Sequence, residues 1–345
     1  MSSPKLPFAT QCTTHAKPTR VSLLDMFACG YDTKRRNVVV KTIFKNSIEE
    51  DINLYLSRCE ELFDQSKFAC IIPPVAIVRS PYRFSFLVTP LWGTYHSIED
   101  LNTIQGVMNF IRCTLTGLSF LHKHRIAHRD IHESNILADY YCYHEVNCDT
   151  RQQAIRDSSR SRPITYALFD FNLSLQLPLE TSLKNCWRPA SEAMLGVSVY
   201  HPDDVVQCEP FYNPFAYDVG CLGFLFINYL TNAIPTVPML AALFGKMTTH
   251  VVNERFTAAE ALDFIHRIEK DITPEILQSP ITLEQNYLAM NDPSLYWSCT
   301  APEFQSAWSS HRPPPFSLRI RLLRWLGSTV RGYKFLKLVR RILCI

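Results

Sequence analysis

The chain has 345 residues, of which 47% are apolar and 19% are charged, as in an ordinary globular protein. This length suits a two-lobed domain, or two modest domains, with a large core. The formal net charge is only +3, so overall basicity gives no reason to expect a nucleic-acid partner. The charge is uneven, however, because residues 312–345 contain nine Lys or Arg and no Asp or Glu.

The 12 cysteines are scattered without a paired spacing, and the first residues lack the long apolar run of a signal peptide. We therefore expect reduced thiols and a cytoplasmic protein. Cys142, His144 and Cys148 form the tightest group of candidate metal ligands. Their spacing matches no standard zinc site, so a metal is not expected there.

The first part of the chain is predicted to be rich in strands, after a flexible lead over residues 1–20. Ser47 can cap one helix whose first turn is acidic. A polar turn between the first two apolar runs is typical of a hairpin. Four runs of apolar or β-branched residues predict strands: 21–29, 38–44, 71–78 and 84–88.

The second part is predicted to be mainly helical. Apolar residues recur at spacings of three and four between Val107 and Leu121, which predicts an amphipathic helix. Thr257 and Glu260 form a capping-box pattern at the start of another helix. Residues 219–245 carry no charge over a length that could span a membrane. Polar residues and two prolines interrupt this stretch, which favours a buried helix near 218–231 and a second short helix.

These elements predict an α+β fold with a small β-rich N-terminal lobe and a larger α-helical C-terminal lobe. We expect the N-lobe over residues 21–92 and the C-lobe over residues 93–275. Residues 138–163 are polar and are expected to form a surface insertion. Residues 276–345 are expected to form a C-terminal extension that is irregular up to residue 315.

Charged residues with a specific spacing follow the first long helix. His128, Arg129 and Asp130 are followed, after four residues, by Asn135. This pattern resembles the catalytic loop of protein kinases. The resemblance implies that Asp130 accepts or orients the proton of a substrate hydroxyl, and that Asn135 binds Mg²⁺. A phosphoryl group in transfer carries spread negative charge, so its site needs a fixed carboxylate and metal ligands around it.

A second motif resembles the metal-binding segment of the same family. Asp170 and Phe171 follow a short apolar run, as in the D-F-G motif of protein kinases. The resemblance implies that Asp170 holds the Mg²⁺ that bridges the phosphates of ATP. Asn172 replaces the glycine of the motif, and Asn tolerates left-handed backbone angles better than most residues. We therefore expect this replacement to be mild.

Four further positions resemble the ATP-binding part of a protein kinase. Lys41 ends a β-branched run, like the lysine that pairs the α- and β-phosphates. Its partner on the following helix is Glu49 by helical register, although the next two acids remain open. Thr89 and Leu91 follow the strand that normally ends at the adenine pocket. They are expected to present backbone groups to the adenine edge.

Besides Asn172, the sequence departs from the protein kinase pattern at two places. Residues 13–20, where the glycine-rich loop would fall, contain no glycine, so backbone can approach the phosphates less closely there. His132 stands where protein kinases often have lysine. Histidine is common at this place in small-molecule phosphotransferases of the aminoglycoside and choline kinase type. A neutral histidine offsets less charge than lysine near pH 7.

Two positions beyond the catalytic motifs also resemble the C-lobe of protein kinases. Asp218 looks like the residue that holds the backbone of the catalytic loop. Arg255 looks like the late arginine that pairs with the glutamate ending the activation segment, and Glu209 is the candidate partner. Arg129 suggests an activation segment that an anion can order. Hydroxyl residues in that segment are candidate phosphorylation sites: Thr181, Ser182, Ser191 and Ser198.

The resemblance covers roughly residues 21–270, and details around Lys41, residues 70–73 and residues 212–215 are most similar to a divergent group of fungal protein-kinase-like proteins. It implies an ATP- and Mg²⁺-dependent kinase that acts on a hydroxyl of an unknown protein substrate, with Ser/Thr favoured. A pseudokinase scaffold and a small-molecule kinase remain as alternatives. The basic tail, residues 312–345, alternates cations with apolar residues. It is expected to be amphipathic and either to touch an anionic membrane surface or to dock on the chain itself.

Overall fold

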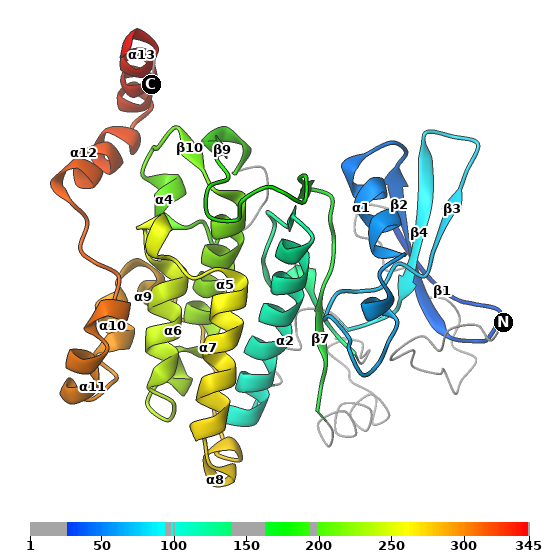
Figure 1. Ribbon diagram of the computed structural model, residues 1–345, viewed down its shortest axis with the longest axis horizontal. Helices are drawn as coiled ribbons and strands as arrows, with labels where there is room; N and C mark the ends of the chain where they lie inside the picture. The colour runs from blue at the N-terminus through cyan, green and yellow to red at the C-terminus, as the bar shows by residue number, and fades with distance from the viewer. Residues whose placement is uncertain (1–25, 94–97, 99–100, 140–162, 194–198, 344–345) are drawn as a thin grey trace, which may run out of the picture.

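The structure is a computed structural model that describes residues 26–93, 98, 101–139, 163–193 and 199–343, except for the side chains at 337, 341 and 343. The glycine-free stretch 13–20, the cysteine and histidine group at 142–148, Ser198 and nearly all of the insertion 138–163 lie outside these residues. A small sheet-containing lobe adjoins a larger helical lobe (Figure 1). The predicted α+β architecture is confirmed.

The smaller lobe contains a four-stranded antiparallel sheet in the order β1-β2-β4-β3. The central strand β2 is β-branched and packs Val38 and Ile43 into the interior. β3 begins later than the sequence predicts, because two prolines at 73 and 74 cannot donate to a ladder. The strands are β1 (Phe27–Tyr31), β2 (Asn37–Phe44), β3 (Ala76–Arg79) and β4 (Phe84–Pro90).

Helix α1 (Ile48–Leu56) is the one long helix of this lobe in the part that the structure describes. Ser47 caps it as predicted, because the Ser47 hydroxyl oxygen accepts a hydrogen bond from the backbone N–H of Glu50 at 3.2 Å. Ile52 and Leu56 are fully buried on its inner face. The helix therefore presents its acidic first turn at a fixed position beside β2.

The larger lobe is built around long helices whose apolar residues form one core. Asn213 caps α5 with hydrogen bonds to two backbone N–H groups, and nearly all of α5 is buried. The uncharged stretch predicted at 219–245 forms most of α5 and part of α6, and no described helix is long and apolar enough to cross a membrane. The long helices are α2 (Ile104–Lys123), α5 (Pro214–Leu230), α6 (Met239–Thr248) and α7 (Ala258–Asp271).

Short strand pairs and one short helix shape the loops between these helices. The pair β6–β7 leads to the two segments that carry the catalytic motifs, and β5 pairs with β8 beside it. The pair β9–β10 lies farther along the chain. These elements are β5 (Ile126–Ala127), β6 (Ile136–Ala138), β7 (Tyr166–Leu168), β8 (Leu175–Gln176), β9 (Arg188–Pro189), β10 (Phe211–Tyr212) and α4 (Asp203–Val206).

The C-terminal extension differs from its predicted irregular course, because short helices form between residues 274 and 307. Proline occupies the first turn of three of them, where its fixed φ suits a helix start. Trp297 is fully buried against the core of the larger lobe. The helices are α8 (Pro274–Leu277), α9 (Tyr287–Asn291), α10 (Pro293–Trp297), α11 (Pro302–Ala307), α12 (Leu318–Gly327) and α13 (Val330–Leu343).

Gly117 lets α2 pack closely against the chain that leads into the smaller sheet. A Cβ atom at Gly117 would lie 2.6 Å from the carbonyl oxygen of Cys70 and 3.3 Å from the side chain of Leu168. We expect Gly117→Ala to lower the free energy of unfolding by about 1–3 kcal/mol, because backbone must shift. Urea unfolding measures this. Gly30→Ala is the control, since a Cβ there meets nothing within 4 Å, and an equal loss in both variants would contradict the packing argument.

Candidate active site

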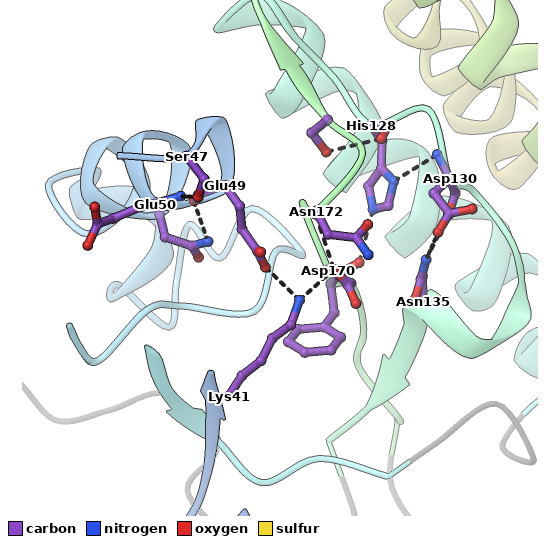
Figure 2. A network of polar contacts seen from close by, with 12 residues as sticks. Lys41, Ser47, Glu49, Glu50, His128, Asp130, Asn135, Asp170 and Asn172 are labelled. Carbon is purple, nitrogen blue, oxygen red and sulfur yellow. Dashed lines mark hydrogen bonds and ion pairs between the residues drawn. The ribbon is translucent and has the colours of Figure 1, made fainter. Parts of the chain in front are cut away.

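Three charged side chains from separate elements meet between the lobes. Figure 2 shows Lys41 extending from β2 toward Glu49 on α1 and Asp170 after β7. The Lys41 Nζ atom lies 2.5 Å from Glu49 Oε1 and 2.7 Å from Asp170 Oδ1. The lysine is only 2% exposed. Burial alone would lower its pKa, but the two carboxylates outweigh burial and raise the pKa, so this ammonium stays charged.

The register of α1 decides which acid reaches Lys41. Glu49 faces the lysine, whereas the carboxylate of Glu50 accepts hydrogen bonds from Ser85 Oγ at 2.7 Å and from the backbone N–H of Asn46 at 2.8 Å. Asp51 is exposed. Burial raises the pKa of Glu49, and the opposing charge of Lys41 offsets part of this effect. Of the three acids in this turn, Glu49 is therefore the one placed to hold the lysine.

The catalytic-loop residues lie on the other side of the site, between β5 and β6. Asn135 Nδ2 donates to the Asp130 carbonyl oxygen at 2.9 Å and lies 3.0 Å from Asp130 Oδ2. His132 Nε2 lies 3.5 Å from the same carboxylate oxygen. Burial would raise the pKa of Asp130, but contacts with His132, Asn135 and His128 outweigh it and lower the pKa. The carboxylate is therefore ionised at neutral pH and can act as a proton acceptor.

The two carboxylate oxygens of Asp130 differ in their surroundings. Asp130 Oδ1 is buried and receives no hydrogen bond from the residues that the structure describes. A buried charged oxygen without a donor is costly, so such an atom calls for a functional explanation. A substrate hydroxyl that donates to Oδ1 would satisfy it.

Asp218 holds the backbone of the catalytic loop by hydrogen bonds, as the sequence predicted. Its Oδ2 and Oδ1 atoms accept hydrogen bonds from the backbone N–H groups of His128 and Arg129, each at 2.7 Å. The His122 Nε2 atom also lies 3.0 Å from Asp218 Oδ2. Asp218 is fully buried at the start of α5. The rigid helix thereby determines where the loop and Asp130 lie.

His128 connects the loop to the Asp170 segment in its neutral form. Its ring is fully buried, with Nε2 3.0 Å from the carbonyl oxygen of Phe169 and Nδ1 3.4 Å from the backbone N–H of Asp130. These contacts assign a donor role to Nε2 and an acceptor role to Nδ1. Its ring centroid is 5.6 Å from that of Phe171. Protonation would remove the acceptor and place a charge in the core.

Stability is expected to fall on mild acidification. Burial lowers the pKa of His128 from its ordinary value of 6.5, so the unfolded chain binds this proton more readily. The stabilisation is present above pH 6.5 and is lost as the pH falls toward the lowered pKa. We expect the thermal stability of His128→Asn to depend less on pH than that of the parent. His266→Gln, at an exposed site, is the control and should show the same pH dependence as the parent. An unchanged dependence in His128→Asn would contradict this. Burial acts in the same direction on His124, His201, His250 and His311.

The backbone near the two motifs departs from one prediction. Asp170 has a φ of 68° and Arg129 a φ of 64°, so both adopt left-handed conformations. Asn172, which replaces the glycine of the family motif, is not in this region. The left-handed tolerance of asparagine is therefore not used at residue 172. Strain of this kind in non-glycine residues costs about 1–3 kcal/mol and collects at functional sites.

Strand pairing in the sheet already uses part of the hydrogen-bonding capacity of the predicted adenine-binding residues. Thr89 lies opposite Val39 in the β2–β4 ladder and is 4% exposed. The backbone N–H of Leu91 donates to the carbonyl oxygen of Asn37 at 3.1 Å. The strand register therefore uses the N–H of Leu91, and the predicted contact with an adenine edge would have to use its carbonyl group.

The prediction that Glu209 pairs with Arg255 is wrong. Arg255 is buried, and its Nη2 atom contacts Asp204 Oδ1 of α4 in a short ion pair. Glu209 instead pairs with Arg319 of the C-terminal extension at 2.9 Å. A signal for Asp204 does exist in the sequence, because Pro202 precedes two acids much as proline precedes glutamate in the A-P-E motif.

An internal carboxylate occupies the position expected for an ordering anion. Arg129 Nη1 lies 3.4 Å from both Glu192 Oε2 and the Tyr212 hydroxyl. Arg188 donates to both oxygens of Glu192, at 3.1 and 2.9 Å. Ser191, one of the predicted phosphorylation sites, is exposed beside this cluster. The activation segment is thus tied to the catalytic loop by its own glutamate.

The oxygen atoms of the site suit a magnesium ion. Mg²⁺ prefers few protein oxygen ligands and keeps several waters, and Asn135 and Asp170 supply such oxygens near one another (Figure 2). Asn135 uses its side-chain nitrogen to contact Asp130 and His132, which leaves the amide oxygen for a ligand. The described residues contain no group of three or more His, Cys, Asp or Glu that could hold a metal. The donor set thus fits magnesium better than zinc.

A two-lobed fold that brings buried Lys41 to the aspartates of two kinase-like motifs, Asp130 and Asp170, defines a protein-kinase-like protein. The family model of the protein kinase domain matches residues 25–239. This match covers more than half of the chain, and the chain belongs to the protein kinase domain family. No curated protein matches the chain significantly.

Proposed function

We propose that this protein is an ATP- and Mg²⁺-dependent protein kinase that transfers the γ-phosphoryl group of ATP to a Ser or Thr hydroxyl of a protein. The observation that carries the proposal is the assembled Glu49–Lys41–Asp170 network, facing a catalytic loop whose Asp130 has an unpaired buried oxygen among the described residues. Maintaining a buried ion network is costly, so a purely structural role explains it poorly.

The residues take distinct roles in this proposal. Lys41, oriented by Glu49, neutralises the α- and β-phosphates of ATP. Asn135 and Asp170 hold Mg²⁺, which offsets the charge that develops on the transferred group. Asp130 orients the substrate hydroxyl and accepts its proton, while His132 stabilises the ionised form of Asp130. Thr89 and the carbonyl of Leu91 line the approach to the adenine.

Two alternatives have specific support. The absence of glycine in residues 13–20 favours a pseudokinase that binds partners without turning over ATP. His132, placed 3.5 Å from Asp130, favours a small-molecule phosphotransferase. The Asp218 and Arg255 contacts resemble the C-lobe scaffold expected of protein kinases, which supports a protein acceptor. A cytoplasmic location completes the proposal.

Transfer of labelled phosphate tests the proposal. The purified full chain is incubated with Mg²⁺ and ATP labelled at the γ-phosphate, with itself, a mixture of proteins or a panel of small alcohols as acceptor. We expect label on Ser or Thr of proteins, and loss of label in Lys41→Met but not in Lys45→Met. Label confined to small alcohols would replace the proposal with the small-molecule alternative, and no label with any acceptor would favour the pseudokinase.

A further inference from the structure

Helices α12 and α13 leave large apolar side chains exposed at the C-terminal end of the fold. In α12, Leu318, Leu322 and Trp325 recur at helical spacing and are 81%, 55% and 69% exposed. α13 exposes five more large apolar side chains, of which Phe335, Leu338 and Ile342 share one face: Val330, Tyr333, Phe335, Leu338 and Ile342. Large apolar side chains gathered in this number on exposed helices mark a candidate interaction site. Figure 1 shows both helices projecting from the larger lobe, away from the sheet.

Arginines of both helices contact the larger lobe. Arg319 pairs with Glu209 at 2.9 Å, and Arg324 pairs with Asp203 at 2.6 Å. Arg340 donates to the carbonyl oxygen of Cys208. Self-docking, one of the two predictions for this tail, therefore takes place, but it uses arginines and leaves the apolar series uncovered by the described residues.

The exposed surface also carries positive charge without any compensating acid. Arg321, Arg331 and Lys334 are exposed and form no ion pair with a residue that the structure describes. Residues 312–345 contain no Asp or Glu. Cations that flank Leu, Trp and Phe on short helices are typical of segments that lie in the interface of an anionic membrane. Neither helix is long enough to span a bilayer.

We propose that this surface of α12 and α13 binds an anionic phospholipid bilayer, with the apolar side chains in the acyl boundary and the cations at the headgroups. A nucleic acid would satisfy the cations but would leave the aliphatic side chains in water. A bilayer satisfies both the cations and the apolar side chains. The Asp203 and Glu209 contacts would then place the kinase domain at a fixed orientation above the membrane.

Vesicle cosedimentation of the full chain tests the proposal independently of its kinase activity. Vesicles contain phosphatidylcholine alone or with phosphatidylserine, at low and at physiological salt. We expect binding that needs phosphatidylserine and weakens with salt. The double variant Arg331→Gln/Lys334→Gln should lose about thirtyfold in affinity, since each cation near such a surface contributes about fivefold.

The apolar contribution needs a separate variant and a matched control. We expect Leu322→Glu/Trp325→Glu to abolish sedimentation with vesicles, and Leu288→Glu, at an equally exposed residue on α9, to bind like the parent. Circular dichroism checks that each variant is folded. Absence of vesicle binding, or unchanged binding of the Leu322/Trp325 variant, would overturn the proposal. Binding of a DNA duplex without any vesicle binding would also overturn it, in favour of a nucleic-acid partner.

Discussion

Asp130→Asn is expected to lower the rate of phosphoryl transfer by roughly 10²–10⁴-fold, the range for losing a general base. Asparagine keeps the size of the side chain and can still contact Asn135, but it cannot accept the proton of the substrate hydroxyl. The contacts of Asp130 with His132 and Asn135 hold the carboxylate ionised and oriented in the parent. Initial rates at saturating Mg-ATP measure the effect.

A matched variant separates this effect from a general loss of folding. Asp263→Asn makes the same chemical change at an exposed residue of α7, so its rate should equal that of the parent. Asp130→Asn should also unfold at nearly the parent temperature, because it removes no buried cation partner. An Asp130→Asn enzyme with the parent rate would show that Asp130 is not the base.

Asp204→Ala is expected to lower the free energy of unfolding by about 3–5 kcal/mol, because it leaves Arg255 as an uncompensated buried charge. Arg255 is 3% exposed, and its other donors already contact the carbonyl oxygens of Thr249 and Ala216. Urea unfolding followed by circular dichroism measures the loss.

Glu209 supplies the control for this prediction. Its partner Arg319 is 75% exposed, and a solvent-exposed pair contributes at most about 1 kcal/mol. Glu209→Ala should therefore cost far less than Asp204→Ala. Equal losses in the two variants would contradict the conclusion that the buried pair of Asp204 and Arg255 contributes more to stability than the exposed pair of Glu209 and Arg319.

Local patterns in the sequence predicted much of the fold and the candidate site. The β-branched run before Lys41 predicts β2, and the Ser47 cap sets the register that brings Glu49 to the lysine. The catalytic loop was readable because its residues lie close together in sequence, so that one short motif identifies them. The buried aspartate Asp218 was found for the same reason, from its neighbours at the start of α5.

Properties that depend on contacts between distant parts of the chain could not be predicted from local sequence patterns. Arg255 pairs with Asp204 rather than Glu209 because of where α4 lies. The proline before Asp203 and Asp204 marks this segment but does not show which acid reaches the arginine. The backbone N–H of Leu91 donates a hydrogen bond to the carbonyl oxygen of Asn37 because of the register between β2 and β4. The strained φ at Asp170, in place of one at Asn172, follows from contacts on both sides of the segment. Tertiary packing decided each case.

Thermal unfolding with nucleotide tests most directly whether the assembled site works. The purified chain is heated with Mg-ATP, Mg²⁺ alone or ATP alone, with Asp170→Ala as the comparison. A ligand that binds only the folded state adds roughly 2.7 kcal/mol of stability at 100 times its Kd. The kinase proposal predicts an upward shift with Mg-ATP that is larger than with either component and is lost in Asp170→Ala. No shift at millimolar Mg-ATP, or an equal shift in the variant, would contradict it.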